Sequence, residues 1–401
     1  MRLDGALVLG AGVTLAALAF GSRPLGVAGI GLLLAAGAAR VWAGFARGPV
    51  SVTYTADPAP ATEGDRVRLR IVARRASRVP VGSIVVHGSL ERVGAHQCRL
   101  AGHGRSATSE LDLGRLPRGR FTVRDARVVI GDHLGLESIS IEVDPAATAV
   151  LVHPRLVELT TLFSDAGRLG GAGRRLLLRR PSGFDFHSVR EYTQGESLRR
   201  VHWPTTARRG QLMVKELEDT PRDAVVVLLD CDPAGASGGS SDSSFDAAVR
   251  AAGSVLKVYA SRGRRAALTT TGRGGAVVQV SSLGEDFQSV LGVLAAAEAN
   301  ARSKLARWLV HEQTRTAQAG ELVVVTANLE PEAVDVLLAI ASRRLLSVVW
   351  VDAPSYAGRP TRTPSGPLRL SGLGIPVAVM RRGDDLATAL DAPRVEAVAR
   401  V

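Results

Sequence analysis

Two acidic side chains, Asp230 and Asp232, stand directly after an apolar, β-branched run at 223–229. Such a run is typical of a strand buried on both faces of a parallel sheet, and α/β sheets carry their sites at the carboxyl ends of the strands. Paired carboxylates there have the chemistry to hold a divalent cation, which prefers oxygen ligands. These two acids are therefore candidate metal ligands.

The other reactive side chains form no catalytic pattern. The Gly-rich run 272–275 lacks the GxxxxGK[ST] pattern and an opening helix, so it is weak evidence for a nucleotide site. Neither Cys98 nor Cys231 has CxxC or Cys/His spacing, which argues against a disulfide framework and a zinc site. Histidines without metal-ligand spacing occur at positions 87, 96, 103 and 133. The sequence predicts that the protein is not an enzyme and uses no cofactor.

The charge of the chain does not indicate nucleic-acid binding. The formal net charge is +12, and lysine occurs only at positions 215, 257 and 304, leaving 47 arginines among the 50 basic residues. These residues are spread along the chain and interleaved with acids, whereas a nucleic-acid footprint requires clustering on one face. We expect no nucleic-acid partner.

The stretch from Gly183 to Glu218 is the most distinctive part of the sequence. Six basic side chains stand beside five acidic ones, a balance that favours internal ion pairing over tracking of phosphates. Tyr192 and Trp203 are aromatic anchors in a chain with few aromatics, and such anchors usually order a segment. Two interpretations stay open: a structural arm packed on the following sheet, or a docking surface for a partner.

The spacing within this stretch resembles a known family. Gly-x-[Asp/Glu]-Phe, Arg-Glu-Tyr-x-x-Gly-[Asp/Glu], Arg-Arg-[Val/Ile]-x-Trp and Ala-Arg-x-Gly-x-Leu-x-Val-Lys-Glu occur in that order. They resemble the bacterial domain of unknown function 58 family. The runs 118–121 and 132–136 resemble its lead-in, so the resemblance covers about residues 115 to 353. His202 and Pro204 stand where the family usually has Asp and Lys, so no role is carried over to them.

The resemblance implies a membrane-anchored protein with a von Willebrand factor A-like fold and no established catalytic activity. Such proteins are often encoded beside a MoxR-type AAA+ ATPase, which makes that ATPase the expected partner. The family-motif residues that we expect at a partner-docking surface are Arg190, Glu191, Tyr192, Gly195, Arg199, Arg200, Trp203, Ala207 and Arg208.

The metal motif of von Willebrand A domains tests that part of the resemblance. It reads Asp-x-Ser-x-Ser after the first strand, with a Thr and an Asp from later loops. Here Asp230 keeps the first place, while Asp232 and Ala234 replace the two serines. One threonine of 269–271 could supply the Thr, but 326–328 reads Thr-Ala-Asn and lacks the Asp. Asp230 and Asp232 are degenerate candidates, and we expect no metal.

Alternating strands and helices must position these residues. An apolar helical face runs from Phe245 to Tyr259, with Asp242 and Ser243 as capping candidates. Further helices are expected near 287–309 and 332–343. Strands after the first are expected near 266–270, 276–280, 322–326, 346–351 and 376–380. This alternation predicts a doubly wound α/β domain over residues 221–401.

The segment before the motif reads differently. From 49 to 153, short runs of alternating apolar and polar residues are separated by turn signals, with no helix-length period between them. Strands are expected at 51–55, 67–72, 83–86, 121–123, 127–130 and 139–143. We expect a small β-sandwich-like domain over 49–153, followed by the family-motif segment at 154–220.

The first 48 residues predict a transmembrane helical hairpin. The run from Gly5 to Ser22 has no charge and spans about 27 Å as a helix. After Arg23-Pro24 a second apolar run reaches Phe45, and Arg40 is its only charged residue. A cleaved signal peptide is the alternative, but the immediate second run argues against it. Arginines lie mainly at the outer ends of the hairpin, which places the bulk of the chain in the cytoplasm.

These observations predict a multi-pass protein of the cell membrane that acts by interaction. We expect an accessory to a MoxR-type AAA+ ATPase in assembly or maturation of envelope or metal-dependent complexes, with the ATPase taken from the resemblance alone. Two alternatives stay open: a divalent-metal-dependent adhesion or binding module, and an uncharacterised nucleotide-dependent enzyme.

Overall fold

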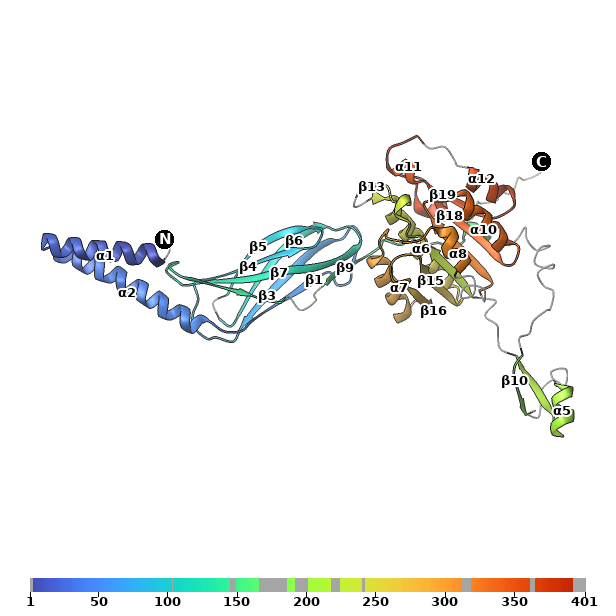
Figure 1. Ribbon diagram of the computed structural model, residues 1–401, viewed down its shortest axis with the longest axis horizontal. Helices are drawn as coiled ribbons and strands as arrows, with labels where there is room; N and C mark the ends of the chain where they lie inside the picture. Colours follow the sequence, from blue (N-terminus) through green and yellow to red (C-terminus); the bar gives the residue numbers. More distant parts are fainter. Residues whose placement is uncertain are drawn as a thin grey trace. The chain divides into compact units, whose positions relative to one another are not determined.

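The computed structural model describes residues 3–102, 104–144, 149–165, 186–191, 201–217, 224–239, 242–311, 319–360 and 365–391. The chain divides between His153 and Pro154 into two compact units. Figure 1 shows the first unit as a helix pair and a β-rich region, and the second as a sheet covered by helices.

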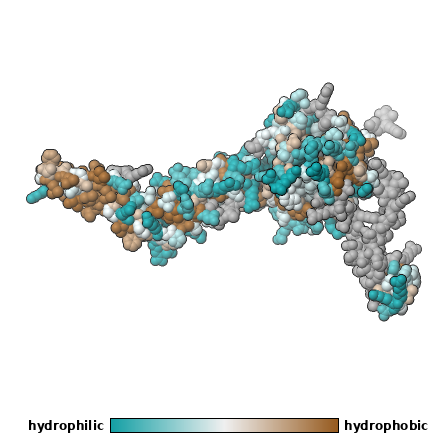
Figure 2. Space-filling view, in the orientation of Figure 1, coloured by the Kyte–Doolittle hydropathy of each residue, from teal (hydrophilic) through white to brown (hydrophobic). Residues whose placement is uncertain are grey.

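The chain begins with two helices that are long and apolar enough to cross a membrane, α1 (Leu3–Phe20) and α2 (Arg23–Ala46). Their surface is predominantly hydrophobic in Figure 2. They approach closely at Gly29, where a Cβ atom would lie 2.7 Å from the backbone nitrogen of Thr14. Arg23-Pro24, predicted as the turn, forms the first turn of α2 because proline is tolerated there.

The β-rich region contains two sheets. A three-stranded antiparallel sheet has the order β1 (Val50–Asp57), β3 (Arg66–Arg75) and β6 (Ser106–Arg115). The other sheet has the order β2 (Ala61–Thr62), β9 (Ala149–His153), β7 (Gly119–Gly131), β4 (Ser83–Leu90) and β5 (Gly94–Leu100), with β8 (Ser138–Glu142) also paired to β7. Alternate residues of β3 are buried in the core that both sheets supply. That burial explains the alternation in the sequence.

Five strands of this region differ from the prediction. The runs 121–123 and 127–130 belong to one strand, β7, which continues through Asp125 with a φ of 52°. Strands β2, β5, β6 and β9 were not predicted. Six of the ten residues of β6 are polar, and only Ala107 of that strand is fully buried, so it carries little apolar alternation.

The second unit is built on a six-stranded sheet. Its order is β16 (Val277–Val280), β15 (Ala266–Thr270), β12 (Val225–Leu229), β17 (Glu321–Thr326), β18 (Leu345–Val351) and β19 (Val377–Met380). All neighbours are parallel except β16, which runs antiparallel to β15. The predicted strands are present at these places. All five residues of β12 are buried, as its continuous apolar run indicated.

Helices supply an apolar layer on each face of this sheet. Val225, Val227 and Leu229 belong to one core with α6 (Ser244–Ser261) and α7 (Glu285–Ala296). Val226 and Leu228 belong to another with α8 (Leu305–His311), α10 (Pro331–Ala341) and α12 (Ser365–Gly372). Short helices α11 (Ala353–Tyr356) and α13 (Leu386–Leu390) follow β18 and β19. Ser243 caps α6 in a reciprocal pair with Asp246, as predicted.

The predicted helix near 287–309 is wrong as a single element. It is two helices, α7 and α8, separated by residues 297–304. In that interval the backbone N–H of Ala301 donates to the carbonyl of Cys231, 2.9 Å away. The Asn300 side chain accepts from the backbone N–H of Arg273 at 2.9 Å. These tertiary hydrogen bonds replace helical ones and draw the connection toward the end of the sheet.

Candidate functional site

The candidate site lies where the order of the parallel strands reverses direction. From β12 the chain first adds β15 and β16 on one side, and then β17, β18 and β19 on the other. A crevice forms at such a switch point, outside the carboxyl ends of the two central strands. Asp230 follows β12 there, and its backbone N–H donates to Val325 of β17 at 2.9 Å.

Asp230 is only 4% exposed and is held by donors from three loops. One carboxylate oxygen, Oδ2, accepts from the hydroxyl of Thr326 at 2.7 Å. The other, Oδ1, accepts from the hydroxyl of Thr271 at 3.1 Å and from the backbone N–H of Asp232 at 3.3 Å. Burial raises the pKa of Asp230 to about 6, although the threonine hydrogen bonds act in the opposite direction.

Asp232 is used differently from Asp230. Its Oδ1 atom accepts from the backbone N–H of Ala234 at 2.9 Å and so caps the short helix Pro233–Gly235. Its Oδ2 atom accepts from the side-chain amide of Asn328, also at 2.9 Å. Asn328 therefore joins the loop after β17 to the loop after β12.

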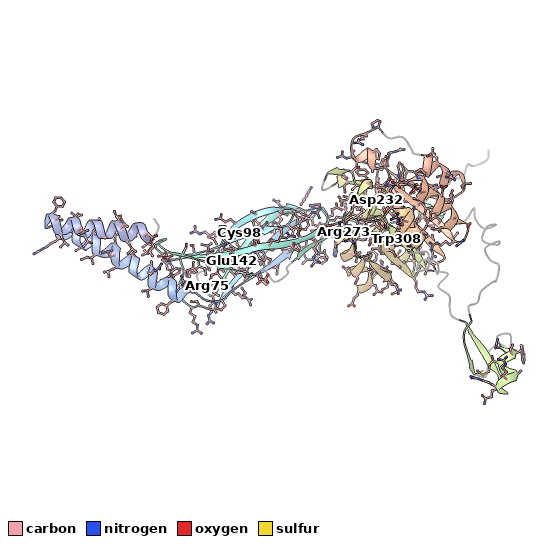
Figure 3. The ribbon with its side chains drawn as sticks, in the orientation of Figure 1. Arg75, Cys98, Glu142, Asp232, Arg273 and Trp308 are labelled. Carbon is pink, nitrogen blue, oxygen red and sulfur yellow. The ribbon has the colours of Figure 1, made fainter. Side chains whose placement is uncertain are left out.

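Cys231 stands between the two acids. Its thiol is 1% exposed, and burial together with the nearby charge of Asp230 raises the pKa of the thiol to about 11. The nucleophilic form of cysteine is the thiolate, which this environment suppresses at neutral pH. The backbone N–H of Cys231 donates to the hydroxyl of Thr271 at 2.8 Å. Asp232 and Arg273, from the loops after β12 and β15, are labelled in Figure 3.

The oxygen atoms at this site do not fit the ligand set of an octahedral divalent ion. All four carboxylate oxygens of Asp230 and Asp232 accept hydrogen bonds from the chain itself. The hydroxyls of Thr271 and Thr326 each donate to Asp230 and also accept a backbone N–H. An ion would have to displace this closed network while gaining few oxygens in return. Within the described ranges, no three His, Cys, Asp or Glu side chains cluster in a way that could hold a metal.

The network explains which residues the sequence analysis missed. Thr271 is the threonine of 269–271 that reaches Asp230. Thr326 and Asn328 were read only as the place of a missing aspartate, yet both bind the acids after β12. The available signal was the polar residues that directly follow a second buried strand, since parallel strands end at the same edge of a sheet.

The family-motif stretch contains a separate small unit, the α5 hairpin, made of β10 (Phe186–Glu191), α5 (Trp203–Arg209) and β11 (Met213–Leu217). Strands β10 and β11 pair antiparallel, with α5 between them in the chain. The hydroxyl of Thr206 accepts from the backbone N–H of Met213 at 3.0 Å, and Met213 is 1% exposed. Helix α5 ends at Gly210, whose φ of 67° is the left-handed conformation that glycine adopts readily.

The structure places only part of the predicted docking set. The backbones of Arg190 and Glu191 lie in β10, opposite Val214 and Met213. The predicted residues outside the described ranges are Tyr192, Gly195, Arg199 and Arg200. Ala207 and Arg208 are exposed on α5. The expectation that Trp203 is a buried anchor is wrong, because its side chain is 63% exposed at the start of this seven-residue helix.

Comparison with known proteins identifies the family. Residues 188–361 match the family described as protein of unknown function DUF58. The uncharacterized protein YeaD of Bacillus subtilis (strain 168) is 27% identical over 278 residues, which cover 66% of this chain and 67% of YeaD. The region 188–361 therefore belongs to the DUF58 family. The family match includes β10, the α5 hairpin and the sheet strands from β12 to β18.

Solved structures show only distant likeness to this DUF58 protein. Cwp6 from Clostridium difficile aligns with 84% of this chain and 46% of its own, at 7% identity and a TM-score of 0.20. A CARDB domain from Pyrococcus furiosus aligns with 25% of this chain and 91% of its own, at 13% identity and a TM-score of 0.17. At these TM-scores neither carries an argument about fold or function.

Proposed function

We propose that this DUF58 protein is a membrane-anchored, non-enzymatic interaction protein with a von Willebrand factor A-like domain. It is an accessory to a MoxR-type AAA+ ATPase in the assembly or maturation of envelope or metal-dependent complexes. The family resemblance supplies the ATPase partner. The two apolar N-terminal helices support the membrane anchoring. The observation that carries the non-enzymatic role is the switch-point network, in which each carboxylate oxygen of Asp230 and Asp232 accepts a hydrogen bond from the chain itself.

The sheet topology supports the von Willebrand A-like assignment. Numbered by their order in the chain, its strands have the order 3-2-1-4-5-6, with strand 3 antiparallel at the edge. That is a doubly wound arrangement, and the Asp230 loop follows its first strand, as the adhesion motif does in von Willebrand A domains. The closed network at that position supports a binding scaffold over a metal-dependent adhesion module.

The chemistry of the same site supports a role without catalysis. A catalytic acid or nucleophile needs access to a substrate and a pKa suited to its task. Asp230 has a pKa near neutrality but is 4% exposed, and the Cys231 thiol is buried with its pKa raised to about 11. The Gly272 to Gly275 turn is tied to Asn300 by a backbone hydrogen bond from Arg273. This connection gives the turn a structural role.

The α5 hairpin is the surface that we assign to the partner. Arg208 and Arg209 are exposed in its last turn, and arginine is enriched at interface hot spots. Charge reversal at Arg199 or Arg208 should reduce co-purification of the AAA+ ATPase from membranes at least tenfold, without lowering the melting temperature. Arg343→Glu, an exposed arginine after α10, is the matched control and should retain the partner. Full retention by Arg199→Glu and Arg208→Glu would refute the docking surface.

Two further variants separate binding from folding in that hairpin. Trp203→Ala should lower the free energy of unfolding by less than about 1 kcal/mol, since its side chain is largely exposed, while weakening ATPase retention. Met213→Ala removes a buried side chain and should cost about 2 to 5 kcal/mol. If both variants destabilise the protein equally, the motif is structural and does not form a docking surface.

Membrane topology is tested by cysteine labelling. We propose that both ends of the α1–α2 helix pair face the cytoplasm, with the turn at Ser22 outside. Cys98 and Cys231 are buried and free, so both native thiols should react slowly. An impermeant maleimide should label Ser22→Cys on intact cells and should leave Ser282→Cys unlabelled until lysis. Labelling of Ser282→Cys on intact cells would reverse the proposed orientation.

A further inference from the structure

A groove lies between the C-terminal end of α2 and strand β8. Its volume is about 540 Å³, and its walls are side chains of α2 and its exit between Arg40 and Gly48 and the segment Glu137–Ile141. Ala43 and Gly44 leave it open because they have little or no side chain there. A Cβ atom at Gly44 would meet nothing within 4 Å.

The helix pair fixes the level of this groove relative to a bilayer. Leu3 and Ala6 of α1 pack with Ala36 and Ala39 of α2, so the start of α1 and this part of α2 lie at one height. An 18-residue helix such as α1 spans about 27 Å, close to the hydrocarbon thickness. The stretch from Arg40 onward then extends about 10 Å beyond the hydrocarbon, through the headgroup layer.

Neighbouring side chains agree with that level. The indole N–H of Trp42 donates to the carbonyl of Pro80 at 2.8 Å, and tryptophan is enriched at membrane interfaces. Leu136, beside β8, packs against the cluster formed by α1 and α2. Leu134, two residues earlier in the same loop, is 65% exposed. The loop before β8 therefore carries one apolar contact with the helix pair and one exposed apolar side chain.

The charge of the groove suits a phosphate. The Arg40 side chain is 75% exposed and lies 3.8 Å from Glu137, at the outer limit of an ion pair. Such exposed pairs contribute little, so Arg40 remains available to a stronger acceptor. Arg47 is exposed and has no ion pair to any residue that the structure describes. Two arginines against one glutamate leave one positive charge, and the guanidinium fork matches phosphate oxygens.

We propose that this groove binds the phosphate headgroup of an anionic glycerophospholipid. Arg40 and Arg47 hold the phosphate, the exposed hydroxyls of Ser138 and Ser140 lie within the same wall, and Leu134 contacts the acyl region. Basic pockets beside transmembrane helices are suited to such headgroups. The proposal rests on the membrane anchoring proposed above.

The test measures lipid retention by the full chain in detergent, using native mass spectrometry with added phosphatidylglycerol or phosphatidylcholine. Each arginine should contribute about fivefold to the phosphatidylglycerol affinity, so Arg40→Gln with Arg47→Gln should weaken it about 25-fold. Arg68→Gln with Arg115→Gln makes the same charge change at exposed positions toward the far ends of β3 and β6, and should leave the affinity within twofold.

Two variants test the groove without removing its positive charge. Gly44→Leu places a side chain in open space, so it should fill the groove and weaken phosphatidylglycerol retention about tenfold while the protein stays folded. Glu137→Gln releases Arg40 and should strengthen retention about fivefold. Phosphatidylcholine retention should not change in any variant.

The outcomes separate the two proposals. Alkaline carbonate extraction of wild-type protein from membranes would overturn the anchoring and the lipid site together. Protein that resists extraction but retains phosphatidylglycerol equally in wild type, the double arginine variant and Gly44→Leu would overturn the lipid site alone. Displacement of phosphatidylglycerol by millimolar inorganic phosphate would show a free-phosphate site and overturn the assignment to lipid.

Discussion

Two acids buried at opposite ends of the central sheet, Glu321 and Asp230, are held in different ways. Glu321 begins β17 at the amino end, is 2% exposed, and accepts from Tyr259 at 2.7 Å and from the Arg264 guanidinium at 2.8 Å. Asp230 follows β12 at the carboxyl end, is 4% exposed, and accepts only from hydroxyls and a backbone N–H among the described residues.

The difference shows what a counter-charge does for a buried carboxylate. Glu321 has a cation in hydrogen-bonding contact, and the guanidinium also lies over the Tyr259 ring, 5.2 Å from its centre. Asp230 has neutral donors that do not fully offset the loss of water, so its pKa rises to about 6. Glu321 at the amino end is held in an ion pair, whereas Asp230 at the carboxyl end titrates near neutral pH.

The largest effect should come from breaking the ion pair. Glu321→Ala removes the buried carboxylate that accepts from Arg264 and from the Tyr259 hydroxyl, and should lower the free energy of unfolding by about 3 to 5 kcal/mol. Urea denaturation of the full chain measures this loss. Glu158→Ala breaks an exposed pair with Lys257 and should cost less than about 1 kcal/mol. Equal losses in the two variants would contradict a structural role for Glu321.

The second effect concerns pH and belongs to Asp230. Its folded-state pKa of about 6 exceeds the ordinary value of 3.8, so between these values the folded chain binds the extra proton. The contribution of Asp230 to the free energy of unfolding is therefore greatest below about pH 4. It falls by about 3 kcal/mol as the pH rises to about 6. Asp230→Asn cannot titrate, so its stability relative to wild type should rise by that amount across the window. Denaturation at pH 4, 5, 6 and 7 measures the difference, and a constant offset would contradict it.

The sheet was predictable because each strand carries its own signal. The continuous apolar residues of β12 and β17 reflect burial on both faces, which local sequence records. The break between α7 and α8 was not predictable in this way. The apolar period of Phe287, Val290 and Leu294 can be continued to Leu305 and Leu309, and only hydrogen bonds to Cys231 and Arg273 show why the helix stops.

The sequence predicted the two acids of the candidate site but not the residues that bind them. Asp230 and Asp232 could be found because they directly follow an apolar strand. Their partners Thr271, Thr326 and Asn328 come from loops 41 to 96 positions later in the chain, and only the register of β12 with β15 and β17 brings them together. The prediction for Trp203 as an anchor failed because it relied on residue type alone. Its residue type favours burial, but a short helix offers it no covering layer.

A smaller effect should follow from removing the link between loops. Asn328→Ala leaves the Oδ2 atom of Asp232 without its amide donor, but Asp232 is partly exposed, so water can replace the contact. We expect a loss of about 1 kcal/mol in the free energy of unfolding. Gln288→Ala, an exposed position on α7, is the control and should stay within about 0.5 kcal/mol. A loss above about 3 kcal/mol would show that Asn328 is central to the carboxyl end.

The smallest expected effect is that of Mg²⁺, because hydrogen bonds already satisfy the carboxylate oxygens of Asp230 and Asp232. Ala234 and Ala327 supply no side-chain oxygen, and an ion with six ligands would have to free Asp230 from Thr271 and Thr326. We expect a dissociation constant of about 1 mM or weaker. At 1 mM Mg²⁺ such binding would stabilise the folded chain by about 0.4 kcal/mol at most. Calorimetric titration of wild type beside Asp230→Ala measures it. Micromolar binding that Asp230→Ala abolishes would show that the network opens to a cation and would restore the adhesion-module interpretation.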